Sequence, residues 1–120
     1  MSKENQIQIL AAKFADSTIK QTEEIRNGHA NIGNRYARQR TAAFKKLRTF
    51  GDAGRDALVL LFEHPRADVR EMAAVYLLRY KTKEALAVLH KEACEVGFVA
   101  FGAQQAIKRW EEGSWNLDPS

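Results

Sequence analysis

Three histidines and one cysteine are the residues of this sequence whose side chains bind metals or act as nucleophiles most readily. His29, His64 and His90 are widely separated, and the chain contains neither a His-x-x-x-His nor a Cys-x-x-Cys pair of the kind that holds zinc. His64 precedes a proline, which is typical of a turn, and we expect Cys94 to be a structural thiol. We therefore predict a protein that is not an enzyme and that needs no metal or other cofactor.

A run of cations provides the strongest charge signal. From Arg26 to Arg48 the sequence has seven basic residues and no acidic one, and the whole chain has a formal net charge of +4. Such a run attracts a negatively charged partner, either a nucleic acid or an acidic protein surface. The alternative interpretation is an ordinary solvated helix face, because long charged side chains cover the helices of most soluble proteins.

Length and composition predict one soluble domain. The chain has 120 residues, 45% of them hydrophobic, which is enough for one core. A single cysteine excludes an internal disulfide and fits a reducing compartment. The first residues lack the apolar run of a signal peptide, and no apolar run approaches the ~20 residues of a membrane helix. We expect a cytoplasmic protein that does not bind a membrane.

The cations belong to the second of two long helices predicted in residues 1–51. Apolar side chains at helical spacing predict a first helix from about residue 5 to residue 26, which ends at Asn27-Gly28 because glycine readily adopts the left-handed conformation that closes a helix. A second helix is predicted from residue 30 or 34 to residue 50, with Tyr36 and Leu47 on its inward side. The cations that fall on another stripe of this helix are Arg35, Arg38, Lys45 and Arg48.

Two shorter helical hairpins are predicted in residues 52–112, before a tail over residues 113–120. In the first hairpin Pro65 breaks the pattern, and a new helix begins near Asp68, whose charge suits the positive end of the helix dipole. In the second we expect helices over residues 82–94, capped by Thr82, and over residues 97–112. We predict no β-strand, because no alternating apolar run bounded by turn residues occurs.

The two hairpins repeat each other. Residues 57–61 match residues 85–89 at an offset of 28, and three apolar positions of the helix after Pro65 match three of the last helix at an offset of 30. Units of this kind stack, because one unit cannot bury its own apolar face. The motif Leu-Leu-x-x-His-Pro-x-x-Asp-Val-Arg-x-x-Ala-Ala-x-x-Leu, from Leu60 to Leu77, resembles a HEAT repeat. The resemblance implies an all-α fold, a HEAT-like right-handed helical repeat array (an α-α superhelix) of about six helices.

The order of elements along the whole chain gives a second resemblance. A long helix, an Asn-Gly-His break, a basic helix and HEAT-like pairs ending in Ile-Lys-Arg-Trp-Glu are similar to a small bacterial HEAT-like family of unknown function. Members of that family are similar to immunity proteins, which are encoded beside polymorphic toxins. The resemblance implies an antitoxin that binds a cognate toxin effector and neutralises it by steric occlusion, and it carries over no catalytic residue.

Candidate partner-binding residues come from the basic stripe and from the second helix of each hairpin. In a repeat array the second helices line one concave face, and exposed aromatic and arginine side chains anchor protein interfaces. The predicted set is Arg35, Arg38, Lys45, Tyr76, Arg79, Phe101, Gln105 and Lys108. The alternative is that Phe98, Phe101 and Tyr76 simply close a small core.

Two other functions fit the same sequence. A nucleic-acid-binding HEAT-like protein would use the cations together with aromatic side chains, but Tyr36 and Trp110 lie on predicted core faces and no acidic side chain lies among the cations. A scaffold or assembly domain would dimerise through Trp115 and Leu117 of the tail. Salt-dependent binding to duplex DNA would identify the first, and sizing after truncation at Gly113 would identify the second.

Overall fold

The computed structural model describes residues 1–114, and this part of the chain contains six α-helices, one 3-10 helix and no β-strand. The predicted all-α fold class is therefore confirmed. The chain divides into two compact units, residues 1–58 and residues 59–120. The short helix after Gly51 falls in the first unit, whereas the sequence pattern grouped it with the hairpins. The expectation of a single domain stays a prediction.

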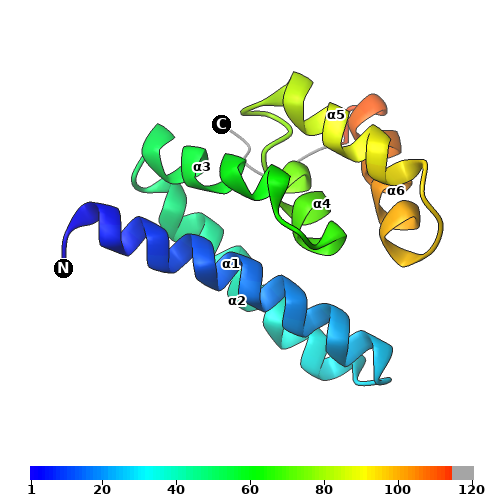
Figure 1. The fold of residues 1–120 in the computed structure, drawn as a ribbon, viewed down its shortest axis with the longest axis horizontal. Coiled ribbons are helices and arrows are strands. Elements are labelled where there is room, and N and C mark those ends of the chain that lie inside the picture. The colour runs from blue at the N-terminus through cyan, green and yellow to red at the C-terminus, as the bar shows by residue number, and fades with distance from the viewer. Residues whose placement is uncertain (115–120) are drawn as a thin grey trace. The chain divides into compact units, whose positions relative to one another are not determined.

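Two long antiparallel helices form most of the first unit. They are α1 (Lys3–Arg26) and α2 (Ala30–Arg48), and they lie side by side (Figure 1). Ser2 caps α1, since its side chain accepts a hydrogen bond from the backbone N–H of Asn5 at 3.1 Å. Gly28 turns the chain with a φ of 81°, a conformation that only glycine adopts at little cost. Both predicted long helices and the predicted stop between them are confirmed.

Both long helices bury polar side chains. Arg40 of α2 is only 7% exposed, and its Nη1 donates a hydrogen bond to Oε1 of Gln21 on α1. On α1, the buried hydroxyls of Thr18 and Thr22 donate to the carbonyl oxygens of Phe14 and Thr18, at 3.0 and 3.1 Å. A hydroxyl that bonds within its own helix is satisfied without any partner from a neighbour, so these polar side chains can be buried.

The last element of the first unit is α3 (Asp52–Val59). Before it, Gly51 closes α2 by donating its N–H to the carbonyl oxygen of Arg48 at 2.9 Å. Gly54 of α3 lies directly against the end of α2, where an added Cβ would overlap the carbonyl oxygen of Leu47. Only glycine fits at position 54, because the group that a side chain would meet is backbone and cannot move aside.

The second unit begins with the 3-10 turn η1 (Leu60–Glu63), followed by α4 (Ala67–Tyr76), α5 (Thr82–Ala93) and α6 (Phe98–Glu111). α5 and α6 pack on each other, and α4 contacts both (Figure 1). Small side chains at these contacts let the helix axes approach closely. The buried residues of this core are Ala74, Leu78, Ala85, Leu89, Ala103 and Ala106.

Two predicted details of the hairpins are wrong. The first helix of the first hairpin, which we expected to continue toward the break at Pro65, is α-helical only as far as Val59, and Leu60 in the 3-10 turn is 77% exposed. Thr82 does not cap α5, because Lys81 holds the cap position and the Thr82 hydroxyl instead donates to a carbonyl of the preceding turn. The predicted docking of the tail through Trp115 and Leu117 lies outside the described residues.

Candidate functional site

The predicted cations of α2 lie mainly on its exposed side. Arg35, Arg38 and Lys45 are exposed, whereas Arg48 is half-buried and departs from the predicted stripe. At 3.6 residues per turn, the exposed three project away from the buried stripe that contains Leu47. We call Arg35, Arg38 and Lys45 the α2 cationic face. Within residues 1–114, none of the three is paired with an acidic side chain.

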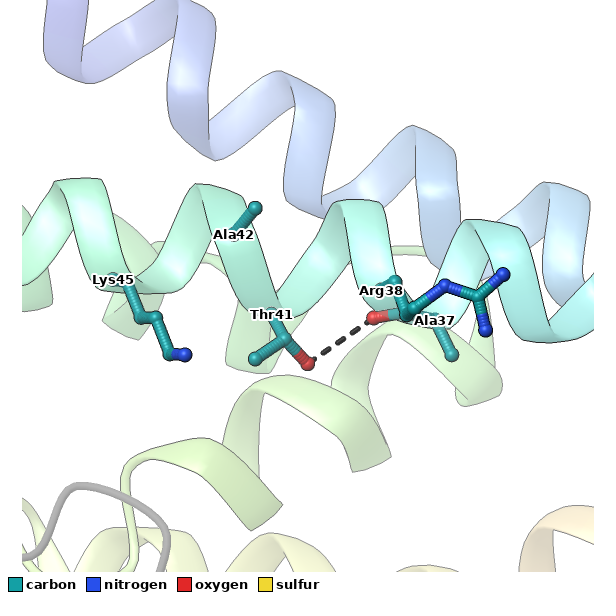
Figure 2. A pocket seen from close by; sticks show the side chains of 5 residues that line it. All are labelled: Ala37, Arg38, Thr41, Ala42 and Lys45. Carbon is teal, nitrogen blue, oxygen red and sulfur yellow. Dashed lines mark hydrogen bonds between the residues drawn. The ribbon is translucent and has the colours of Figure 1, made fainter.

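A shallow hollow runs along this face, and all of its lining residues come from α2. They are Ala37, Arg38, Thr41, Ala42 and Lys45. Figure 2 shows Arg38 and Lys45 at the two ends and Thr41 between them, with the Thr41 hydroxyl donating to the carbonyl oxygen of Ala37 at 3.1 Å. One side of a single helix cannot enclose a small molecule, so the two cations suit an extended anionic surface better than a buried ligand.

The outward side of α6 carries strongly exposed aromatic side chains. Phe98 and Phe101 are 61% and 63% exposed and lie one turn apart, and Val96 just before the helix is 94% exposed. Further along the same stripe, Gln105 is half-buried and Lys108 is exposed. We call Phe98, Phe101, Gln105 and Lys108 the α6 face. The alternative expectation that the two phenylalanines close the core is wrong.

The two remaining predicted partner-binding residues, Tyr76 and Arg79, differ in their exposure to solvent. Arg79 follows α4 in a turn and is exposed, as expected. Tyr76 is only 4% exposed, so its prediction as a surface anchor is wrong. Tyr76 lies seven residues after Val69 and three after Ala73, which places it on the buried stripe of α4. That spacing was visible in the sequence.

An ion pair that the sequence does not reveal joins α4 to α5. Nε of Arg70 donates to Oε1 of Glu92 at 2.8 Å, and Glu92 is 3% exposed. Nη1 of Arg70 also donates to the backbone carbonyl oxygens of His64 and Pro65, at 2.8 and 3.1 Å. A buried carboxylate is costly without its partner, so Arg70 fixes the turn before α4 and holds α4 to α5.

Asp68 serves the first turn of α4, where its position predicted it. Its Oδ1 accepts the backbone N–H of Val69 at 2.9 Å, and its two oxygens accept from the guanidinium of Arg66 at 3.1 and 3.0 Å. The backbone N–H of Arg66 in turn donates to Nδ1 of His64 at 3.0 Å. His64 and Asp68 are therefore engaged in the turn itself, which gives them a structural role.

The histidines and the cysteine do not build a metal site in the described part of the chain. Nδ1 of His29 lies 2.8 Å from Oε2 of Glu24 at the turn between α1 and α2. His90 and Cys94 are four residues apart at the end of α5, and both are exposed. This mixed pair matches neither the His-x-x-x-His nor the Cys-x-x-Cys motif considered in the sequence. Within residues 1–114, no three metal-binding side chains gather in one place. The expectation that the protein is not an enzyme stays a prediction.

Comparison with known proteins identifies a shared fold. No protein-family model matches the chain, and no curated protein matches its sequence. The structure is similar to the crystal structure of the protein RPA1889 from Rhodopseudomonas palustris CGA009, with a TM-score of 0.85 and 24% sequence identity over 92% of both chains. At this identity the similarity shows the fold alone. Among the described helices, none combines the length and the apolar character that a membrane span requires.

Proposed function

We propose that this chain is a non-catalytic protein-binding module and that the α6 face is its anchor. The observation that carries the proposal is the 61% and 63% exposure of Phe98 and Phe101, which lie on neighbouring turns of one helix. Exposed apolar patches mark interaction sites, and aromatic side chains are enriched in protein interfaces. Gln105 and Lys108 continue the same stripe and supply a polar rim.

We further propose that η1 with α4 and α5 with α6 are two repeats of a HEAT-like right-handed array. Each repeat consists of two helical segments joined by a turn, and buried alanines such as Ala74 and Ala103 lie where the second helices meet their neighbours. The ion pair between Arg70 and Glu92 joins the second helix of one repeat to the first helix of the next. Contacts between successive repeats hold a repeat array together, and this ion pair supports our interpretation of the fold.

The partner we propose is a cognate bacterial toxin, which the chain neutralises as an immunity protein by covering an active site or the path to it. The family resemblance of the sequence supports this choice, together with surfaces that suit a protein better than a small substrate. The α2 cationic face steers an acidic toxin surface into the complex, an effect that raises the association rate more than the affinity. We place the protein in the cytoplasm, because its single cysteine fits a reducing compartment.

Co-expression with the product of the neighbouring gene tests this function. We expect that product to arrest growth, and this chain to restore growth and to co-purify with it. Replacing Phe98 and Phe101 together by alanine should weaken the complex by more than about tenfold. The matched control is Ile9→Ala, which removes an apolar side chain that is 53% exposed on α1 and should leave the affinity unchanged. A neighbour that is harmless alone, or that forms no complex with this chain, rules out the antitoxin function.

The α2 cationic face supports a second candidate function, binding of nucleic acid. Arg35, Arg38 and Lys45 are exposed and unpaired with acidic side chains in residues 1–114, which suits phosphate groups as well as carboxylates. Titration of generic duplex DNA at low salt tests this candidate. The double variant Arg38→Glu/Lys45→Glu should then make the plot of log affinity against log salt less steep, with a slope smaller in magnitude by about two. A wild-type chain that does not bind at low salt removes it.

A further inference from the structure

We propose that a second copy of this chain covers the α6 face when no other protein is bound, with the two α6 helices packed antiparallel around a two-fold axis near Phe101. This inference goes beyond the proposed function, because it assigns an occupant to the face of the free protein. It rests on two independent features of residues 95–108, which are the distribution of exposed apolar side chains and the order of charges.

The exposed apolar side chains are concentrated at the start of α6. Val96, Phe98 and Phe101 are 94%, 61% and 63% exposed, and all three lie within residues 96–101. In a two-fold pair each copy presents the same patch, so the phenylalanines of one copy meet those of the other. Aromatic rings in contact are favourable in offset or edge-to-face arrangements, in addition to the apolar surface that they bury.

The order of charges selects a second copy and sets its direction. Residues 96–107 contain no charged side chain, whereas exposed Glu95 precedes this stretch and exposed Lys108 follows it. Lys108 lies seven residues after Phe101, about 10 Å further along the helix axis. An antiparallel pair centred near Phe101 therefore places Lys108 of each copy close to Glu95 of the other, and a parallel pair would bring like charges together. Within residues 109–114, Arg109 carries one positive charge and Glu111 and Glu112 carry two negative ones, so these charges cancel except for one negative charge.

The small size of the face predicts a weak dimer. One side of a single helix buries less surface than the interfaces of permanent dimers. A partner with a larger interface can therefore displace the second copy. Self-association and partner binding are mutually exclusive, because both use the α6 face. The free protein would then hide its phenylalanines from water until the partner arrives.

Analytical ultracentrifugation of the full-length protein over a range of concentrations tests the dimer. We expect the mean mass to rise from one copy to two, and Phe101→Ala to lower the association constant by at least about tenfold. Glu95→Lys and Lys108→Glu should each lower it by about threefold to tenfold, and the double variant Glu95→Lys/Lys108→Glu should restore it. Lys13→Glu on α1 is the matched control, since it makes the same change of charge as Lys108→Glu on a helix of the first unit and should have no effect. All four positions are exposed, and far-UV circular dichroism verifies that each variant keeps its helices.

Several outcomes would overturn the inference. These are a wild-type chain that stays monomeric at every concentration, a dimer that Phe101→Ala leaves unchanged, or a double charge variant that does not restore association. Truncation after Gly113 should keep the dimer, and its loss would assign self-association to the tail instead. A monomeric wild-type chain leaves the proposed toxin binding intact, because that function is tested with the toxin and not with the chain alone.

Discussion

The two units of this chain hold their helices together in different ways. In the first, helices of 24 and 19 residues bury the polar side chains of Thr18, Thr22 and Arg40. In the second, helices of 10, 12 and 14 residues meet through alanines and leucines, and a buried ion pair joins Arg70 to Glu92. A long helix can satisfy some polar groups by itself, as the two threonines show, and still bury enough surface. Short helices depend on close approach and on a specific pairing with a neighbour.

The two units also differ in the side chains that they expose. The first unit presents cations and the second presents aromatic side chains, on α2 and α6 respectively. Charges act at a distance and guide an encounter, whereas aromatic side chains act on contact and hold a complex. We therefore expect substitutions on α2 to change association rates and their salt dependence, and substitutions on α6 to change dissociation rates.

The largest expected effect on stability comes from Gly54→Ala in the first unit. The added methyl group would overlap the backbone of Leu47, so we expect a loss of about 4 kcal/mol in the free energy of unfolding. Urea denaturation followed by far-UV circular dichroism measures it. The counterpart in the second unit is Gly102→Ala, where the methyl group would lie 2.8 Å from Oε1 of Glu71, and a side chain can yield, so the loss should be about 1 kcal/mol. Equal losses would contradict the distinction between a backbone and a side-chain obstacle.

The next effect comes from Arg70→Ala in the second unit. Removing the guanidinium leaves the Glu92 carboxylate buried without its cation, and we expect a loss of about 3 kcal/mol in the free energy of unfolding. Both tryptophans lie in residues 59–120, so tryptophan fluorescence during urea denaturation follows this unit. The double variant Arg70→Met/Glu92→Leu should recover most of the loss, because it removes both charges. A double variant as unstable as Arg70→Ala would show that the ion pair is not the cause.

A smaller effect is expected from Arg40→Leu, the corresponding change in the first unit. The guanidinium of Arg40 donates to the side-chain amide of Gln21, and this acceptor is half-buried and can turn toward water once the guanidinium is removed. We expect a loss of about 1 kcal/mol, measured by circular dichroism in urea. If Arg40→Leu costs as much as Arg70→Ala, then the first unit depends on a specific polar pairing just as the second does.

The smallest effect concerns Lys20 on the exposed side of α1. A hydrogen bond and the charge of Asp16, whose Oδ2 lies 3.1 Å from Nζ, raise the pKa of Lys20 above its ordinary value of 10.5. A raised pKa in the folded state means that this interaction stabilises the fold below pH 10.5 and is lost as the pH rises through the pKa of the folded state. Asp16→Asn should lower the pKa of Lys20 in an NMR titration of the Nζ resonances. An unchanged pKa in that variant would assign the shift to another neighbour.

Periodicity predicted the surfaces better than it predicted the individual residues. The exposure of Phe101, Lys108 and Arg38 follows from their positions opposite a core stripe, and the structure places all three on the outside. Tyr76 was misplaced for the same reason in reverse. It lies on the buried stripe by spacing, but its polar group suggested exposure. Spacing was the more reliable signal, because a long side chain can be buried when its polar end finds a partner.

The sequence by itself determined the two long helices, the stop between them at Gly28 and the exposed cations of α2, because each of these depends on residues within a few turns of one another. Only the tertiary structure decided which distant groups meet. Arg70 pairs with Glu92 at a separation of 22 residues, and Arg40 bonds to Gln21 at a separation of 19. Gly54 must be a glycine only because α3 turns back onto the carbonyl oxygen of Leu47. Such contacts depend on how whole helices pack, and helical periodicity does not encode which residues of two helices come together.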